Sequence, residues 1–258
     1  MQQFADQEIG HMRVERLYAS YRSYLLALAY RMLGSVSDAE DVVQELFAAV
    51  HEDRLPNVSN LKAYLAKAVT HRCLNVLKSA VKRRVTYVGE WLPEPWMETP
   101  DSTAEEVERR DDISYAFLVL LEKLTPLERA VLVLREAFGY DYAEIAGMLD
   151  KTETACRKVL SRARKKLGVR AAQPAPVHPR GERKLVQKWV SALASGNIED
   201  ILDLIAEDAV LVTDGGGRTR AAINPIFGRD RVAALLRTLA TRRFQHAKLY
   251  VAPINGAL

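Results

Sequence analysis

The sequence predicts a multidomain protein in which two all-α helical domains are followed by an α+β domain. Three observations carry this prediction. Apolar residues recur at helical spacing through the first two thirds of the chain, proline-rich stretches interrupt them at 91–96 and 174–179, and a strand with a glycine run follows only afterwards. The 258 residues leave room for roughly one to three domains.

The composition is that of an ordinary folded protein and excludes several classes. Net charge is +4, 48% of residues are hydrophobic and 27% are charged, which excludes disordered and collagen-like chains. The longest apolar runs have seven residues, far below the about 20 that cross a bilayer. Cys73 and Cys156 have neither disulfide nor metal-ligand spacing. We expect a cytoplasmic protein without membrane contact.

Charge is arranged in blocks along the chain. Residues 54–89 hold eight Lys or Arg and no Asp or Glu, residues 90–112 hold nine acids against two Arg, and residues 151–170 hold eight basic residues against Glu153. Two positive surfaces separated by an acidic spacer indicate that the chain binds a polyanion and contacts it at two places.

The first domain is predicted to be helical. Gly34 is expected to end one helix, and Ser37-Asp38-Ala39-Glu40 has the pattern of a capping box that opens the next. Asn60 is expected to cap a third helix with an apolar stripe and an outward basic face. The stripe comprises Leu61, Leu65, Ala68, Val69, Cys73, Val76, Leu77 and Ala80.

The second domain has helix-turn-helix spacing. Trp91 to Trp96 contains two prolines and begins a linker, after which 113–124 is expected to be helical. Thr125 to Glu128 and Asp141 to Glu144 have capping patterns, and a break at 150–152 precedes a longer helix to Leu167. Its outward side chains are types that read a DNA groove.

The C-terminal third follows a proline-rich linker. Residues 184–194 are expected to be helical, Asn197 to cap a second helix, and 209–213 and 244–252 to form strands around a helix at 229–241. Three consecutive glycines from Gly215 allow a tight turn, and without a following Lys and Ser or Thr they are no phosphate loop.

The order of these motifs resembles the extracytoplasmic-function sigma factors, the promoter-recognition subunits of bacterial RNA polymerase. The resemblance rests on 30–35 with 38–45, on 63–78, and on 124–133, 142–146 and 161–164. It implies region 2 within 1–89, an acidic linker at 90–111 and region 4 within 112–170. A proline-rich linker at 171–181 and a regulatory domain at 182–258 would follow.

The resemblance also implies three sets of binding residues. The polymerase set, expected to dock on core RNA polymerase, is Asp38, Glu40, Asp41, Gln44 and Glu45. The minus-10 set, expected to bind the minus-10 element of promoter DNA, is Lys62, Tyr64, Lys67, Thr70, His71, Arg72, Asn75 and Lys78. The minus-35 set, expected to bind the minus-35 element of promoter DNA, is Thr152, Glu153, Thr154, Arg157, Lys158, Ser161, Arg162 and Lys165.

Residues 69–74 and Trp91-Leu92-Pro93-Glu94-Pro95 resemble one subgroup, which carries a C-terminal SnoaL-like cone domain. Only 77 residues remain from Glu182, so its sheet is expected to be incomplete. The resemblance implies that this domain regulates the chain by contacting the linker and sigma regions, without a separate anti-sigma factor. The regulatory set is Trp91, Pro93, Pro95, Asp214, Gly215, Gly216, Gly217 and Arg218.

Two alternative functions stay open at this point. The chain could be a helix-turn-helix regulator that works without core polymerase, or a ligand sensor or enzyme built on its C-terminal domain. Neither the carboxylates of 38–45 nor His71 with Cys73 have the partners that a metal site requires. We therefore expect no cofactor, no metal and no enzymatic activity.

Overall fold

The computed structural model describes residues 2–49, 60–84, 91–96, 115–168, 179–195, 197–215, 221–242 and 254–255. The expected strand at 244–252 lies outside them. None of the helices in these ranges is long and apolar enough to cross a membrane.

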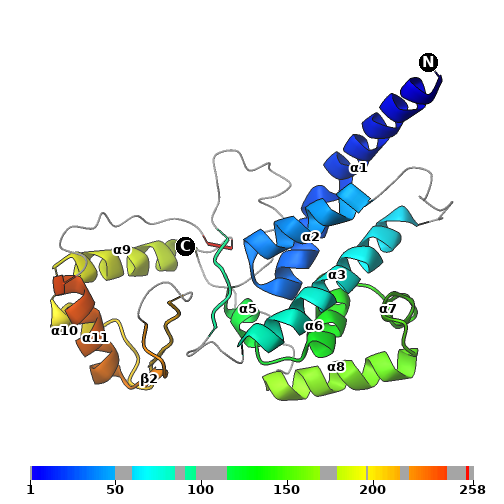
Figure 1. Ribbon diagram of the computed structural model, residues 1–258. Coiled ribbons are helices and arrows are strands. Elements are labelled where there is room, and N and C mark those ends of the chain that lie inside the picture. Colours follow the sequence, from blue (N-terminus) through cyan, green and yellow to red (C-terminus); the bar gives the residue numbers. More distant parts are fainter. Residues whose placement is uncertain are drawn as a thin grey trace.

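In the described residues 2–84, the chain is helical. The helices are α1 (Gln2–Leu33), α2 (Val36–Ala49) and α3 (Leu61–Arg84). The N-terminal turns of α1 project beyond the other helices, whereas its C-terminal half packs on α2 and α3 (Figure 1). Gly34 ends α1 as expected, in a left-handed conformation with φ of +70°. Asn60 caps α3 as expected, since its Oδ1 accepts the Ala63 N–H at 3.0 Å.

The expected capping box at Ser37 was wrong by two residues. Helix α2 already begins at Val36, and the Oγ of Ser35 accepts the Asp38 N–H at 3.2 Å. The reason is the sharp turn at Gly34, because it makes Ser35 the residue that directly precedes the helix, which is the N-cap position. Further along α2, the Oε1 of Glu40 forms an ion pair with the guanidinium of Arg22 on α1, at 3.9 Å.

Residues 115–168 are largely helical as well. The helical segments are α5 (Tyr115–Leu121), α6 (Pro126–Leu132), the π-helical turn η2 (Val133–Ala137), α7 (Tyr142–Leu149) and α8 (Glu153–Leu167). Both expected capping boxes, Thr125 with Glu128 and Asp141 with Glu144, are confirmed. The helix expected to reach Leu124 ends three residues earlier, at Leu121, and Thr125 is extended, as the residue before a proline usually is.

One hydrophobic core joins these two groups of helices. Leu25 of α1, Leu65 of α3, Val131 of α6 and Leu160 of α8 are all buried in it. Arg129 of α6 is 3% exposed, and its guanidinium donates to the carbonyl oxygen of Met32 on α1 at 3.1 Å. The predicted regions 2 and 4 therefore pack against each other.

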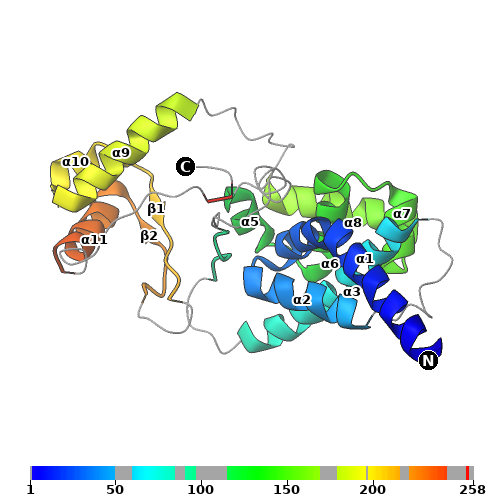
Figure 2. The same cartoon turned by 90° about the horizontal axis from the view of Figure 1, so that it is seen from above.

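The C-terminal elements form a separate group beside the helical body, as two views at right angles show (Figures 1 and 2). They are α9 (Pro179–Ser195), α10 (Ile198–Leu202), β1 (Val210–Leu211), β2 (Ile226–Phe227) and α11 (Arg229–Arg242). A small core with buried Ala192, Ile201, Ile205, Val232 and Ala233 holds the helices together.

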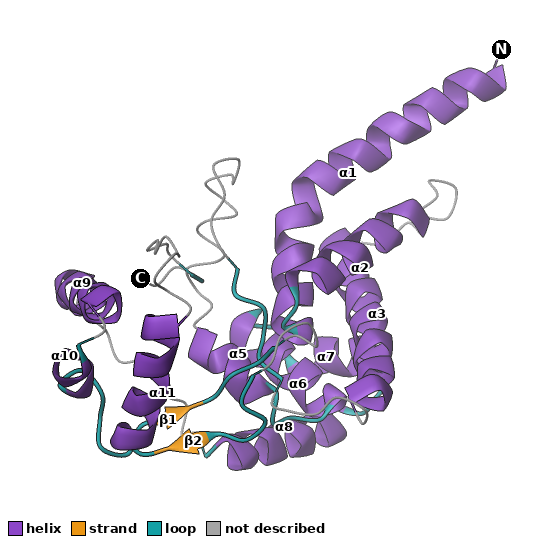
Figure 3. Cartoon of the chain, turned by 60° about the vertical axis from the view of Figure 1, so that its left-hand side comes forward, coloured by secondary structure: helices purple, strands orange, loops and turns teal. Residues whose placement is uncertain are grey.

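Two boundaries in this part differ from the predictions. The strand expected at 209–213 is only two residues long in β1, which pairs with β2 in an antiparallel sheet (Figure 3). Helix α9 begins at Pro179, inside the predicted linker at 171–181. Proline is favoured at the first position of a helix because its missing N–H is not needed there. Asn197 caps α10 as expected.

Candidate nucleic-acid interface

The minus-10 set lies along α3, but its members differ in exposure. Lys62, Tyr64, Asn75 and Lys78 are exposed, whereas Lys67, His71 and Arg72 are half-buried. Lys62 also lies over the ring of Tyr24, with its Nζ 4.2 Å from the ring centroid. The exposed members leave a cationic and aromatic face of the kind that binds a single nucleic-acid strand.

One member of the minus-10 set, Thr70, lies on the buried side of α3. Its side chain is fully buried, and its Oγ1 has no hydrogen-bond partner among the described residues. The helical spacing explains this, because Thr70 adjoins the buried residues Ala66, Val69 and Cys73 of α3.

Lys67 and His71 contact the C-terminal end of α7. The Lys67 Nζ donates to the Gly147 carbonyl at 2.7 Å and lies 3.0 Å from the Asp150 carboxylate. The His71 Nε2 is 2.7 Å from the Met148 carbonyl oxygen. Unpaired carbonyls at a helix C-terminus attract donors and cations, and Lys67 holds the pKa of Asp150 below its ordinary value.

The minus-35 set lies on α8 and faces solvent. The buried face of α8 holds Cys156, Val159, Leu160 and Ala163, as predicted from the spacing. All members of the set are exposed except Glu153, which is half-buried. Thr152 caps the helix by accepting the Ala155 N–H at 3.2 Å. The first turns of α8 are thereby left with an outward polar face.

Arg157 is held in place within this set. Its guanidinium donates to the Glu153 carboxylate at 2.7 Å and lies 4.8 Å from the ring centroid of Tyr142. Arg135 lies over the same ring at 4.9 Å. Tyr142 on α7 thus links Arg157 to the body of the helix-turn-helix.

The polymerase set lies on the outer face of α2. Asp38, Asp41, Gln44 and Glu45 are exposed, and Glu40 is half-buried. The opposite face packs on α1 and α3 through Ala39, Val42, Val43, Leu46 and Phe47. This division gives α2 an acidic surface on an otherwise packed helix.

The segment 91–96, here called the linker segment, is hydrogen-bonded along its length. The Tyr115 hydroxyl of α5 donates to the Pro93 carbonyl at 2.9 Å, and the Tyr30 hydroxyl of α1 donates to the Glu94 carbonyl at 2.7 Å. Burial raises the pKa of Tyr30 to about 12, so the hydroxyl stays a donor. Of the regulatory set, Pro93 is buried, whereas Trp91 and Pro95 are exposed.

Asp214 and Asn255 of the C-terminal part, which follows α8, are hydrogen-bonded to this linker segment. The Leu92 N–H donates to the Asp214 carboxylate at 3.0 Å. Trp96 and Asn255 exchange two bonds of 3.1 Å, one from the Trp96 N–H to Asn255 Oδ1 and one from the Asn255 N–H to the Trp96 carbonyl. Gly215 is described as well, whereas Gly216, Gly217 and Arg218 lie outside the described residues.

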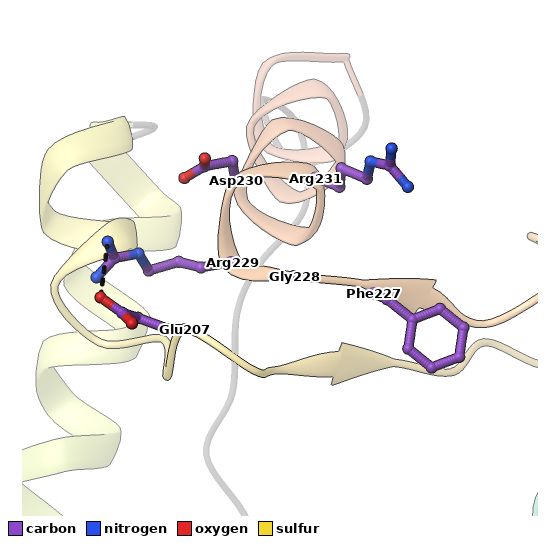
Figure 4. A pocket seen from close by; sticks show the side chains of 6 residues that line it. All are labelled: Glu207, Phe227, Gly228, Arg229, Asp230 and Arg231. Carbon is purple, nitrogen blue, oxygen red and sulfur yellow. Dashed lines mark ion pairs between the residues drawn. The ribbon is translucent and has the colours of Figure 1, made fainter.

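A pocket of about 370 Å³ lies where β2 runs into α11 (Figure 4). It is lined by Glu207, Phe227, Gly228, Arg229, Asp230 and Arg231. The lining includes two acids and two arginines, of which Arg229 lies 3.9 Å from Glu207, and it includes no histidine, cysteine or serine. Nor do His, Cys, Asp and Glu gather into a metal-binding group anywhere in the described ranges.

Sequence reasoning missed Glu94, Tyr142, Asp150 and Asn255 as members of these interfaces. Glu94 stands inside the quoted linker motif, and Tyr142 and Asp150 stand inside the helix-turn-helix pattern. No local signal marks Asn255, because its partners Tyr30 and Trp96 are 225 and 159 positions away.

Comparisons with known proteins place the chain among the sigma factors. The family model "Sigma-70 region 2" matches residues 17–83, and "Sigma-70, region 4" matches 114–167. The ECF RNA polymerase sigma factor SigJ of Mycobacterium tuberculosis is 34% identical over 232 residues, or 87% of this chain and 72% of SigJ. A probable ECF sigma factor of that species, SigI, is 30% identical over 76% of this chain and 68% of its own length.

The crystal structure of the M. tuberculosis extracytoplasmic function sigma factor SigJ is similar as well. Its TM-score is 0.74 at 29% identity, and the match covers 94% of this chain and 82% of that one.

Proposed function

The chain belongs to the extracytoplasmic-function sigma factors of RNA polymerase, and from this premise we propose how its surfaces share the work of transcription initiation. A sigma factor binds core polymerase and promoter DNA. The observation that carries the proposal is the pair of basic, solvent-facing helix surfaces on α3 and α8.

We assign the minus-35 element to α8. The exposed Arg157, Lys158 and Arg162 stand on the second helix of a helix-turn-helix, which is the element that enters the major groove. Arginine can bind guanine through two hydrogen bonds, and lysine neutralises phosphates.

We assign the minus-10 element to the exposed part of α3. Lys62, Lys78 and Asn75 can bind the backbone of an opened strand, and Tyr64, which is 37% exposed, offers a ring for stacking. Lys67 and His71 can join this surface only when α7 moves away, because both now contact it.

We assign core polymerase to the acidic outer face of α2. Asp38, Asp41, Gln44 and Glu45 are free for a partner surface because the helix packs through its opposite face. A basic or polar groove on the polymerase would complement these side chains.

We further propose that residues 182–258 form a SnoaL-like domain that modulates this activity through the linker segment. The hydrogen bonds from the Leu92 N–H to Asp214 and from the Trp96 N–H to Asn255 support such a route. The comparisons give no support to the expectation that the chain works without a separate anti-sigma factor, and it stays a prediction.

The test is promoter-dependent transcription by core polymerase with the full chain at fixed salt. We expect the parent chain to initiate transcription specifically at its promoters. The double variant Arg157→Ala with Lys158→Ala should lose initiation on promoters that have a minus-35 element. The double variant Lys62→Ala with Lys78→Ala should be impaired in opening the DNA strands. Binding to duplex DNA that is unaffected by core polymerase, without any initiation, would instead support the helix-turn-helix regulator.

A further inference from the structure

The N-terminus of α2 is capped partly from outside its own chain segment. The first backbone N–H groups of a helix have no partner within the helix. Ser35 accepts the N–H of Asp38, and the Glu94 carboxylate accepts the N–H of Val36 at 2.8 Å. The Ser35 hydroxyl also donates to the same Glu94 oxygen at 3.3 Å. A residue 58 positions away thus completes the cap of α2.

The position of Glu94 is set by its backbone. Its N–H donates to the carbonyl oxygen of Gly34 at 2.6 Å, and its own carbonyl accepts the Tyr30 hydroxyl at 2.7 Å. Trp96 packs edge-on against the Tyr30 ring, with 4.8 Å between the ring centroids. The linker segment is therefore fastened to the junction of α1 and α2.

Residues of the C-terminal part hold both flanks of Glu94. Asp214 accepts from Leu92, two positions before it, and Asn255 bonds Trp96, two positions after it. Asn255 is only 3% exposed, and its Nδ2 also donates to the Tyr30 hydroxyl at 3.2 Å. Glu94 itself is exposed, so its position depends on hydrogen bonds rather than on burial: those of its own backbone to Gly34 and Tyr30, and those of its neighbours Leu92 and Trp96 to Asp214 and Asn255.

We propose that Glu94 is a positioning residue for core-polymerase binding, which holds the N-terminus of α2 in place, and that Asp214 and Asn255 act on α2 through it. The inference rests on the proposed function of α2. A negative charge at a helix N-terminus adds to the effect of the hydrogen bond because it interacts favourably with the helix dipole. Release of the C-terminal ties would loosen this cap and weaken the docking of α2.

The experiment measures the dissociation constant of the full chain for core RNA polymerase at one salt concentration. Glu94→Ala should weaken binding about three- to tenfold. Glu94→Gln should weaken it less, since the amide oxygen still accepts a hydrogen bond without the charge. Glu199→Ala, which removes an exposed acid from the first turn of α10, is the matched control and should change nothing.

The C-terminal ties are tested in the same assay. Asn255→Ala should weaken core binding in the same direction as Glu94→Ala. The double variant should bind no worse than Glu94→Ala alone, because both changes act by one route. A purely structural role would instead lower the thermal unfolding temperature without changing core affinity below that temperature.

Variants of the α2 surface separate the two possible failures. Asp41→Asn with Glu45→Gln removes two exposed charges without touching the cap. If this variant binds core polymerase as the parent does, the assignment of α2 to the polymerase fails, and the inference fails with it. If it binds more weakly while Glu94→Ala matches the Glu199→Ala control, only the role of Glu94 is overturned. Additive effects of Glu94→Ala and Asn255→Ala would overturn the common route.

Discussion

Lys67 on α3 and Asp150 in the turn between α7 and α8 form an ion pair of 3.0 Å across the two halves of the helical body. The pair joins α3, which we propose binds the minus-10 element, to the turn before α8, which we propose binds the minus-35 element. Lys67 is engaged by Asp150 and by the Gly147 carbonyl. Under this proposal, Lys67 reaches promoter DNA only when α3 and α7 separate.

Asp150→Asn should raise the affinity of the free chain for promoter DNA, by no more than about fivefold because the pair is exposed. Asparagine tolerates the left-handed backbone at this position, where φ is +52°, so the turn is kept. Fluorescence anisotropy with promoter DNA measures the effect. The control is Asp203→Asn, which changes the net charge by the same amount on the exposed surface of the C-terminal part. An equal gain in DNA affinity in that variant would contradict the prediction.

Arg157→Ala should weaken binding to minus-35 DNA by about 1–3 kcal/mol and relax the base preference at one position. Tyr142→Ala should have a smaller effect in the same direction, since the ring supports Arg157 without reaching DNA. Titrations against matched and mutated duplexes measure both. Lys184→Ala on α9 is the control, and a loss as large as that of Arg157→Ala would show a nonspecific charge effect.

Thr70→Val should stabilise the chain by about 1 kcal/mol, because it removes a buried hydroxyl that has no described partner. Promoter opening should stay unchanged, since Thr70 is fully buried. Urea unfolding measures the first effect and permanganate reactivity of the opened strand the second. If Thr70→Val impaired promoter opening without changing the stability of the chain, Thr70 would instead be a residue that contacts DNA.

Gly34→Ala should destabilise the chain by about 1–2 kcal/mol. Its φ of +70° is strained for any residue with a Cβ, and an added Cβ would lie 3.2 Å from Glu122 Oε1. Gly147→Ala is the matched control, because Gly147 lies inside α7 with open space around it. Alanine there should stabilise the helix by up to about 1 kcal/mol. Equal unfolding free energies for both variants would contradict the argument.

The stability of the α6 cap should fall in acid. Burial alone would raise the pKa of Glu128, but hydrogen bonds from Lys166 and Thr125 outweigh it and lower the pKa below its ordinary value. The stabilising contribution is therefore complete above the ordinary pKa of a glutamate and is lost as pH falls through the lowered one. Urea unfolding between pH 7 and 3 measures this, and Glu128→Gln should flatten the dependence. An unchanged slope in that variant would assign the acid sensitivity to other groups.

Local sequence patterns predicted much of the helical architecture. The caps at Asn60, Thr125 and Asp141 are confirmed because each depends on groups only three positions apart. The buried stripe of α8 is confirmed for the same reason, since helical spacing alone decides which side chains share a face. The motif order indicated the sigma factor family, which the comparisons confirm.

Tertiary structure decided how these parts are joined. Nothing near Lys67 in the sequence shows that it meets Asp150, 83 positions away, and nothing near Glu94 shows that it completes the cap of α2. Asn255 bonds Tyr30 across 225 positions. Such contacts depend on how whole helices pack, and packing is set by a shared core to which distant segments contribute together. Sequence periodicity therefore determined which faces exist, whereas packing determined which of them are covered.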